Sequence, residues 1–416
     1  MKDEERKIYG GFLIVPLKYD DGGLNTNVLE NVGRPIAPTT MDLNENVKAM
    51  LNHTGSASVG RGYICPAGRL CSVLGENITY FTVADEKVSY DFLLNDSYIY
   101  VFNTRVAFLC LSLSFDRMEA LKTIINPGWA FNPAKFFFHS GEETIGFSME
   151  NWLADILAPM GLRKFFDGDS SYLLDYYVYN FALVPEWFDE LEPMKKLTFN
   201  LHKMLSLDVT LEDEAEEDVR FVYAAKNQDM KAYRWGCCVT SQTISYVVAD
   251  DKLDLDAQMD IQAADGLPVV MLALYEKYTC LRFTELITDI HRKELKRLKE
   301  LMLNFRAFGT VTPANLSRWH NVKQIYAGLL DVNDIPTAIE DISVKLSIIA
   351  DRQEAIDHAR SETVVNLVTV FGIVSIMASV LTIVQILASG SALVWISTIL
   401  TAVMLVLVVT LALLRR

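Results

Sequence analysis

Apolar and charged positions are most unevenly distributed at the C-terminal end of the chain. Two apolar runs, Val364 to Ala388 and Ala392 to Leu414, contain no Asp, Glu, Lys or Arg and are separated only by Ser389-Gly390-Ser391. Each run reaches the roughly 20 residues that a helix needs to cross a hydrocarbon core. The pattern predicts a transmembrane hairpin over residues 364–416.

The residues around these runs predict the orientation of the hairpin. The short uncharged connection leaves no room for an extracellular domain, and Arg415 and Arg416 favour the cytoplasmic side of a membrane. The start, Met1 to Arg6, lacks the apolar stretch of a signal peptide. We therefore expect a multi-pass protein of the cell inner membrane with both termini cytoplasmic.

Between Ile8 and Leu281, stretches typical of strands alternate with helical patterns, which predicts an α+β cytosolic sensor domain over residues 1–274. Strand-like stretches are rich in Val, Ile, Tyr and Phe. They are Ile8 to Tyr19, Ile78 to Val83, Tyr98 to Phe115, Tyr172 to Val184, Val219 to Ala225, Tyr233 to Val248 and Val269 to Leu274. Helical patterns cover Arg117 to Ile125, Met149 to Leu157 and Glu186 to Leu205.

Long helices are predicted over residues 275–363. A charged helix should run from Phe283 to Phe308 and end before Gly309 and Pro313, and a second should run from Ala314 to Leu330. No Pro or Gly separates Pro336 from Gly372, so one helix can continue from Pro336 through the first apolar run to Ala388. At 1.5 Å per residue this stalk would span roughly 80 Å.

The soluble half of the predicted stalk carries an apolar seam, formed by Ile339, Ile342, Leu346, Ile349 and Ile356. One long helix, half in lipid and half in water, cannot bury such a seam alone. We expect copies of the chain to associate around a central axis as a homo-oligomer.

The first apolar run also carries a polar face. At 100° per residue Ser375, Ser379, Thr382 and Ser389 fall within about 80° of one another, with Gly372 close by and Gln385 at the margin. Small and hydroxylated residues also let membrane helices pack closely, which is the alternative interpretation. In a symmetric ring the same residues would line a pore.

The same face continues toward the cytosol. Val368 and Val365 come first, followed by Ser361, Asp357 and Glu354. A ring of copies would then have an apolar gate at Val365 and Val368 and an acidic cytosolic ring at Glu354 and Asp357, as in a cation pathway. We predict a pore on this basis.

The composition limits the partners and the chemistry that we expect of this chain. The formal net charge of −15, from 38 Lys and Arg against 53 Asp and Glu, makes nucleic acid an unexpected partner. The six cysteines form no C-x-x-C pair, which favours buried thiols in a reducing compartment. The six histidines show no H-x-x-x-H pairing, and no G-x-S-x-G or kinase signature occurs. We expect neither enzymatic activity nor a cofactor, and a metal site is not readable.

One stretch is a candidate for binding an anion. The segment His53 to Gly62 is glycine-rich but lacks the ending of a P-loop, so a plain loop is the alternative. Arg61, Arg69 and Arg105 are the cations that we expect to contact an anionic ligand, because guanidinium groups hold phosphates through paired hydrogen bonds.

The order of these segments resembles the CorA superfamily of magnesium and related cation transporters. That resemblance covers roughly Tyr275 to Arg416 and implies a homopentamer, with the first span lining the pore and cations passing through it. The front two thirds match only in being α/β and cytosolic.

The chain departs from the transporters where the first span ends. Those proteins carry a Gly-Met-Asn signature, whereas this chain reads Ala388-Ser389-Gly390-Ser391-Ala392. The chain looks more like the CorA-like membrane proteins of type III CRISPR systems, antiviral effectors that answer the nucleotide second messenger SAM-AMP. The resemblance implies a pore gated by a nucleotide. A divalent-cation transporter with a degenerate filter and a membrane-tethered scaffold without a pore are the alternatives.

Overall fold

A computed structural model places most of the chain in two compact units, Met1–Ser343 and Val344–Arg416. The described residues are 8–36, 40, 42–51, 58–75, 78–84, 88–125, 135–140, 142–166, 176–185, 188–204, 219–223, 233–288, 292–387, 395–396, 398–399 and 401–403.

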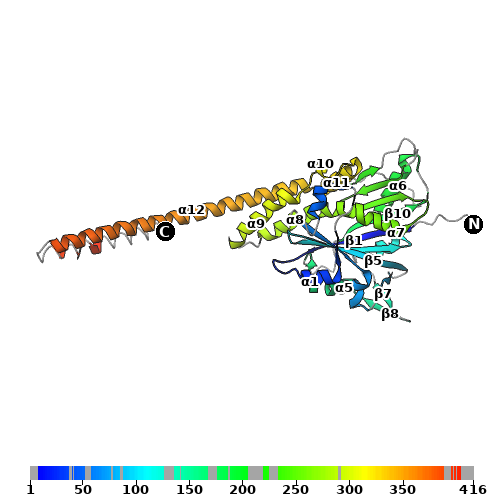
Figure 1. Ribbon diagram of the computed structural model, residues 1–416, viewed down its shortest axis with the longest axis horizontal. Helices are drawn as coiled ribbons and strands as arrows, with labels where there is room; N and C mark the ends of the chain where they lie inside the picture. The colour runs from blue at the N-terminus through cyan, green and yellow to red at the C-terminus, as the bar shows by residue number, and fades with distance from the viewer. Residues whose placement is uncertain are drawn as a thin grey trace, which may run out of the picture. The chain divides into compact units, whose positions relative to one another are not determined.

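The first unit is built on one mixed sheet of 13 strands (Figure 1). The main path is β11 (Arg220–Tyr223), β12 (Trp235–Val239), β13 (Thr243–Ala249), β10 (Tyr177–Val184), β1 (Ile8–Lys18), β6 (Val106–Phe115), β5 (Ser89–Phe102), β4 (Tyr80–Ala84), β7 (Lys135–Ser140) and β8 (Glu143–Phe147). The short strands are β2 (Arg34–Ile36), β3 (Gly60–Cys65) and β9 (Arg163–Lys164). Strands β10 and β13 are parallel, and the other pairs are antiparallel.

Strand β6 lies between layers of side chains on both faces of the sheet. Every residue from Val106 to Phe115 is buried, as expected of a strand that is covered on both sides. Leu109 and Leu111 point into the main apolar core, whereas Phe108 and Cys110 point the other way, toward a long helix. The alternation follows from the two-residue period of a strand.

Helices cover the sheet on both sides. Those of the first unit are α1 (Thr26–Val32), α2 (Glu45–Met50), α3 (Ala67–Leu70), α4 (Met118–Ile124), α5 (Met149–Leu157), α6 (Leu191–His202), α7 (Leu255–Ile261), α8 (Leu267–Thr288), α9 (Arg292–Asn304), α10 (Pro313–Leu316) and α11 (His320–Val332). Residues of α4 and α5 pack into the main core. Helix α8 covers the opposite face, where Tyr275 stacks on Phe102 at 4.2 Å between ring centroids.

The prediction of a strand at Val269 to Leu274 is wrong, because these residues belong to α8. All of them are buried. A helix buried on every side reads as a continuous apolar run, which periodicity cannot distinguish from a buried strand. The predicted helices at Arg117 to Ile125 and Met149 to Leu157 are confirmed as α4 and α5.

Two predicted strand stretches fold into hairpins. Tyr98 to Phe115 turns at Arg105, whose φ is 70°. Tyr233 to Val248 turns after β12, where the Thr240 hydroxyl accepts a hydrogen bond from the Thr243 amide at 2.9 Å. This hydrogen bond to the Thr240 side chain stabilises a turn that contains no glycine.

The later helices differ from the prediction at two places. The predicted charged helix from Phe283 to Phe308 comprises the end of α8, as far as Thr288, and α9 from Arg292, with residues 289–291 outside the described residues. A π-helical turn at Phe305–Gly309 ends α9, as the glycine predicted. The predicted helix from Ala314 to Leu330 is instead two helices, because Ser317 is extended and its hydroxyl accepts from the Trp319 amide at 3.0 Å. As far as Ser343, these helices belong to the same unit as the sheet.

Helix α12 (Ile335–Leu387) is a single helix of 53 residues, which confirms the predicted uninterrupted helix (Figure 1). Part of the predicted seam lies in the first unit, where Ile342 is buried and Ile339 is half-buried. Ile356 is exposed. The self-association of copies along this helix stays a prediction. The second predicted span lies outside the described residues, apart from helical residues 395–396, 398–399 and 401–403.

Candidate functional site

The apolar half of α12 is the first candidate region. Its most apolar stretch has a mean hydropathy of 2.3, and none of it is buried. Among the described residues this is the one helix long and apolar enough to cross a membrane. An exposed apolar stretch of this length is typical of a helix that contacts lipid or another protein.

The predicted polar stripe lies on this helix. Gly372, Ser375, Ser379 and Thr382 are exposed and share one face. The Ser379 hydroxyl donates to the Ser375 carbonyl at 2.9 Å, and the Thr382 hydroxyl donates to the Ala378 carbonyl at 2.8 Å. Each donor is therefore satisfied within the helix, while the hydroxyl oxygen keeps lone pairs for water or another helix.

The other stripe residues have the predicted exposure where they are described. Val365 and Val368 are exposed, as are Glu354 and Asp357. The side chain of Gln385 and the whole of Ser389 lie outside the described residues. The stripe therefore runs on one helix from Glu354 to Thr382.

A second candidate region is a group of charged side chains in the first unit, here called the β1-end cluster. It gathers residues at the end of β1, in the turn between β5 and β6, and on β9, α8 and α9. The members are Lys18, Asp20, Asp21, Arg105, Arg163, Arg282, Glu285 and Arg297.

Two cations of this cluster are buried. Lys18 and Arg282 have side chains only 3% and 4% exposed, and both contact Glu285, at 2.6 and 2.7 Å. Arg282 also contacts Asp20 at 3.1 Å, and Arg163 reaches the same carboxylate at 3.2 Å. Buried cations require such partners, so the carboxylates anchor α8 against the end of β1.

The ion pairs set the protonation of the carboxylates. Burial by itself favours the neutral form of Glu285, but Lys18 and Arg282 outweigh it and lower the pKa of that carboxyl. In the same way Arg163 and Arg282 outweigh burial at Asp20 and lower its pKa. Both groups are ionised at neutral pH.

Asp21 joins two further elements. Arg297 of α9 donates to both of its carboxylate oxygens, one at 2.7 Å, and Arg105 lies 3.7 Å away. Gly161, at φ +74°, lets the following turn meet the loop after Asp21, because a Cβ there would lie 1.8 Å from the Gly23 carbonyl oxygen. The loop that carries both aspartates is thereby held in place.

The three arginines predicted to bind an anion lie in different local surroundings. Burial raises the pKa of Tyr19 to about 12, and the charges of Arg105 and Arg61 both oppose that rise. Arg69 lies on α3, where it donates to the Asn31 carbonyl at 2.6 Å. The binding of an anion by these arginines stays a prediction.

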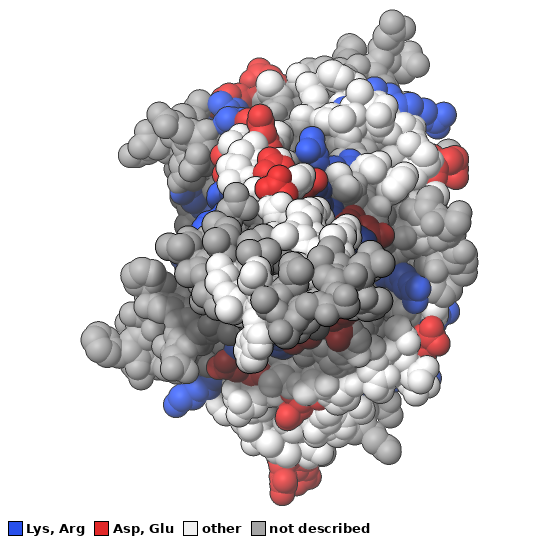
Figure 2. Space-filling model, turned by 90° about the vertical axis from the view of Figure 1, so that its left-hand side faces the viewer, with Lys and Arg blue, Asp and Glu red and all other residues white. Residues whose placement is uncertain are grey.

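Sequence reasoning missed most of the β1-end cluster. The consecutive Asp20 and Asp21 after a strand, followed by two glycines, were a local signal for a polar turn. The arginines that meet them come from segments far apart in the chain, so no motif joins them. Basic and acidic side chains are intermixed on the face drawn in Figure 2, without a continuous patch of one sign.

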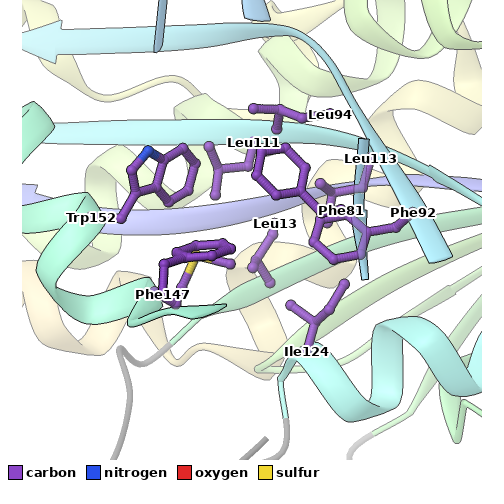
Figure 3. A pocket seen from close by; sticks show the side chains of 10 residues that line it. Leu13, Phe81, Phe92, Leu94, Leu111, Leu113, Ile124, Phe147 and Trp152 are labelled. Atoms are coloured by element: carbon purple, nitrogen blue, oxygen red, sulfur yellow. The ribbon is translucent and has the colours of Figure 1, made fainter. Parts of the chain in front are cut away.

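The remaining chemistry gives no third candidate region among the described residues. A small cavity of about 10 Å³ is lined by apolar side chains, among them Phe81, Phe147 and Trp152 (Figure 3). It is at the lower limit for one water molecule, so it is a packing gap rather than a ligand site. The described residues contain no group of three metal-binding side chains. All six cysteines are free and buried, which confirms the predicted buried thiols.

Searches against protein-family models, curated proteins and solved structures find no match to this chain.

Proposed function

We propose that this chain forms a homo-oligomeric membrane channel whose first unit senses a cytosolic anionic ligand. The observation that carries the proposal is α12, one unbroken helix that begins in the folded unit and continues through an apolar segment with a hydroxyl-bearing face. Gly372, Ser375, Ser379 and Thr382 on this face are exposed.

A ring of copies would give each part of this helix a role. The hydroxyls of Ser375, Ser379 and Thr382 would face water in the pore, while the large apolar side chains on the other faces would contact lipid. Val365 and Val368 would form an apolar constriction that closes by excluding water. Glu354 and Asp357 would concentrate cations at the cytosolic entrance.

The β1-end cluster is the proposed sensor. Within it Arg105 and Arg297 share the single carboxylate of Asp21. The charges of Arg105 and Arg61 both act on Tyr19. Guanidinium groups bind phosphate through paired hydrogen bonds, so a phosphate-bearing ligand fits this chemistry. The cluster ties α8 and α9 to the sheet, and a ligand that competes for the arginines would alter that tie.

The resemblance to CorA-like proteins supports a more specific role. In it the channel is a pentamer of the inner membrane, and the ligand is a nucleotide second messenger such as SAM-AMP. Opening the pore would then act against viral infection by dissipating ion gradients. Genes for type III CRISPR proteins beside the gene for this chain would support the role.

Conductance of the full chain in liposomes tests the channel proposal. We expect ligand-dependent ion flux, and we expect Ser379→Leu to reduce it at least tenfold because the bulky group narrows the hydroxyl-lined path. Val380→Leu, one residue away on another exposed face, is the matched control and should conduct normally. Vesicles that stay ion-tight with every candidate nucleotide would contradict the proposal.

A divalent-cation transporter is the second candidate, favoured by the exposed carboxylates of Glu354 and Asp357. Growth of a magnesium-requiring strain that expresses the chain tests it. Failure at every concentration of added magnesium would exclude this alternative.

A scaffold without a pore is favoured by the hydroxyls that bond within their own helix. Such a protein should assemble and function regardless of Ser379→Leu. The same liposome experiment therefore separates the scaffold from the channel.

A further inference from the structure

Helix α8 carries a second buried carboxyl that lies outside the β1-end cluster. Glu276 is only 2% exposed. It accepts a hydrogen bond from the Val311 amide at 2.9 Å and another from the Tyr326 hydroxyl at 2.8 Å. One side chain therefore joins α8, the connection between α9 and α10, and helix α11.

No cation balances this carboxyl among the described residues. The ionisable groups whose pKa Glu276 raises are Tyr275 and Cys280 of its own helix and Tyr326 of α11, and all three are neutral at physiological pH. Moving a carboxylate out of water without a counter-charge costs several kcal/mol. Burial therefore raises the pKa of Glu276 to about 7, although both hydrogen-bond donors oppose the shift.

Glu285 on the same helix shows the opposite arrangement. It is paired with Lys18 and Arg282, and its pKa lies below the usual value. The two glutamates differ only in their tertiary partners. Glu285 is held ionised at neutral pH, whereas Glu276 changes its charge there.

Glu276 lies beside the element that leads into α12. Tyr326 is fully buried on α11, which ends at Val332. After Asn333 and Asp334, α12 begins at Ile335, which is itself buried in the first unit. Asp334 between them has a φ of 50°, so the connection is a tight turn. A change in how α11 packs on α8 therefore reaches the first turns of α12.

We propose that Glu276 is a proton-responsive joint, in which the neutral carboxyl keeps α11 packed on α8 and its ionisation loosens that packing where α12 begins. The step is a simple proton exchange with water, because the carboxyl loses its proton to solvent as the segment opens. This regulation goes beyond ligand binding and does not depend on conduction.

Hydrogen exchange of the full chain in lipid nanodiscs tests the joint. After correction for intrinsic rates, we expect exchange of the α11 amides to rise about tenfold between about pH 6 and about pH 8, the interval in which the closed carboxyl ionises. Glu276→Gln cannot ionise and should abolish the rise. Glu340→Gln, an exposed glutamate of α12, is the matched control and should retain it.

Two results would overturn the proposal: a wild-type protein whose corrected exchange does not change with pH, or a Glu276→Gln variant that keeps the wild-type rise. If the Glu276→Gln variant does not fold, the Tyr326→Phe variant tests the proposal instead. Removing a donor to the carboxylate should move the midpoint of the rise to higher pH, and an unchanged midpoint would contradict the role of Glu276.

Discussion

The first unit and the apolar half of α12 have similar side chains in opposite surroundings. Phe108 on β6 is 0% exposed, whereas Ile376 on α12 is 66% exposed. The chain folds around the first kind of residue, while the second kind is exposed on a helix that is long and apolar enough to cross a membrane. Apolar character alone therefore does not reveal what buries a residue.

Charged residues show the same contrast. The first unit buries Lys18 and Arg282 because carboxylates from other elements meet them. The apolar half of α12 has no charged residue that would need such a partner. A folded domain can satisfy a buried charge with distant parts of the chain, whereas a lone helix in lipid cannot.

The largest expected effect on stability comes from a substitution in the core of the first unit, and it tests whether the two regions differ. Phe108→Ala removes a ring that contacts Tyr278 of α8, and we expect it to destabilise the first unit by about 4 kcal/mol. Ile376→Ala should leave the unfolding of that unit unchanged. Denaturant unfolding of the full chain in micelles, followed by tryptophan fluorescence, measures both. Equal losses would mean that the two regions do not differ as described.

The pH dependence of stability has an intermediate expected size, and it tests the difference between the two glutamates of α8. The raised pKa of Glu276 gives stability that is complete below about pH 4.5 and is lost as pH rises through about 7, by about 3 kcal/mol in total. The lowered pKa values of Asp20 and Glu285 give stability that is present above their usual pKa and is lost as pH falls through the lowered value.

We therefore expect the first unit to be most stable in mildly acidic solution. Thermal unfolding as a function of pH measures this. Glu276→Gln should remove the decline on the neutral side and leave the decline on the acid side. A wild-type stability that rises steadily toward neutral pH would contradict the assignment.

The smallest stability effect concerns the exposed part of the β1-end cluster. Arg297→Ala removes a half-exposed ion pair with Asp21 and should cost about 0.5 kcal/mol, as exposed pairs do. Arg220→Ala breaks an exposed pair with Asp331 outside the cluster and should cost about the same. Only Arg297→Ala should weaken nucleotide binding, measured by calorimetry. Equal nucleotide affinities of the Arg297→Ala and Arg220→Ala variants would contradict the proposal that the β1-end cluster binds the ligand.

Local pattern predicted much of the secondary structure. The period-3.6 pattern of Met149 to Leu157 and the absence of Pro and Gly between Pro336 and Gly372 were sufficient for α5 and α12. The run Val269 to Leu274 was misassigned because the helix is buried on every side. Ile342 was assigned to a seam between copies, although it is buried in the first unit.

The candidate sites divide in the same way. The polar stripe of α12 could be predicted, since its residues follow one another at helical spacing. Arg61 and Arg105 could be selected as cations, but nothing local indicated that Arg69 belongs elsewhere or that Arg282 and Arg297 join the cluster. Their partners lie more than 200 residues away in the chain.

The sequence by itself determined the continuous helix α12, its apolar half and its hydroxyl-bearing face, because each depends on neighbours within a few turns. The tertiary structure alone decided which charges are paired. Glu276 and Glu285 are the same residue type on one helix, and the groups that distant segments bring to them raise the pKa of one and lower the pKa of the other. The free energy of a buried charge depends on its surroundings in space rather than on its neighbours in the chain.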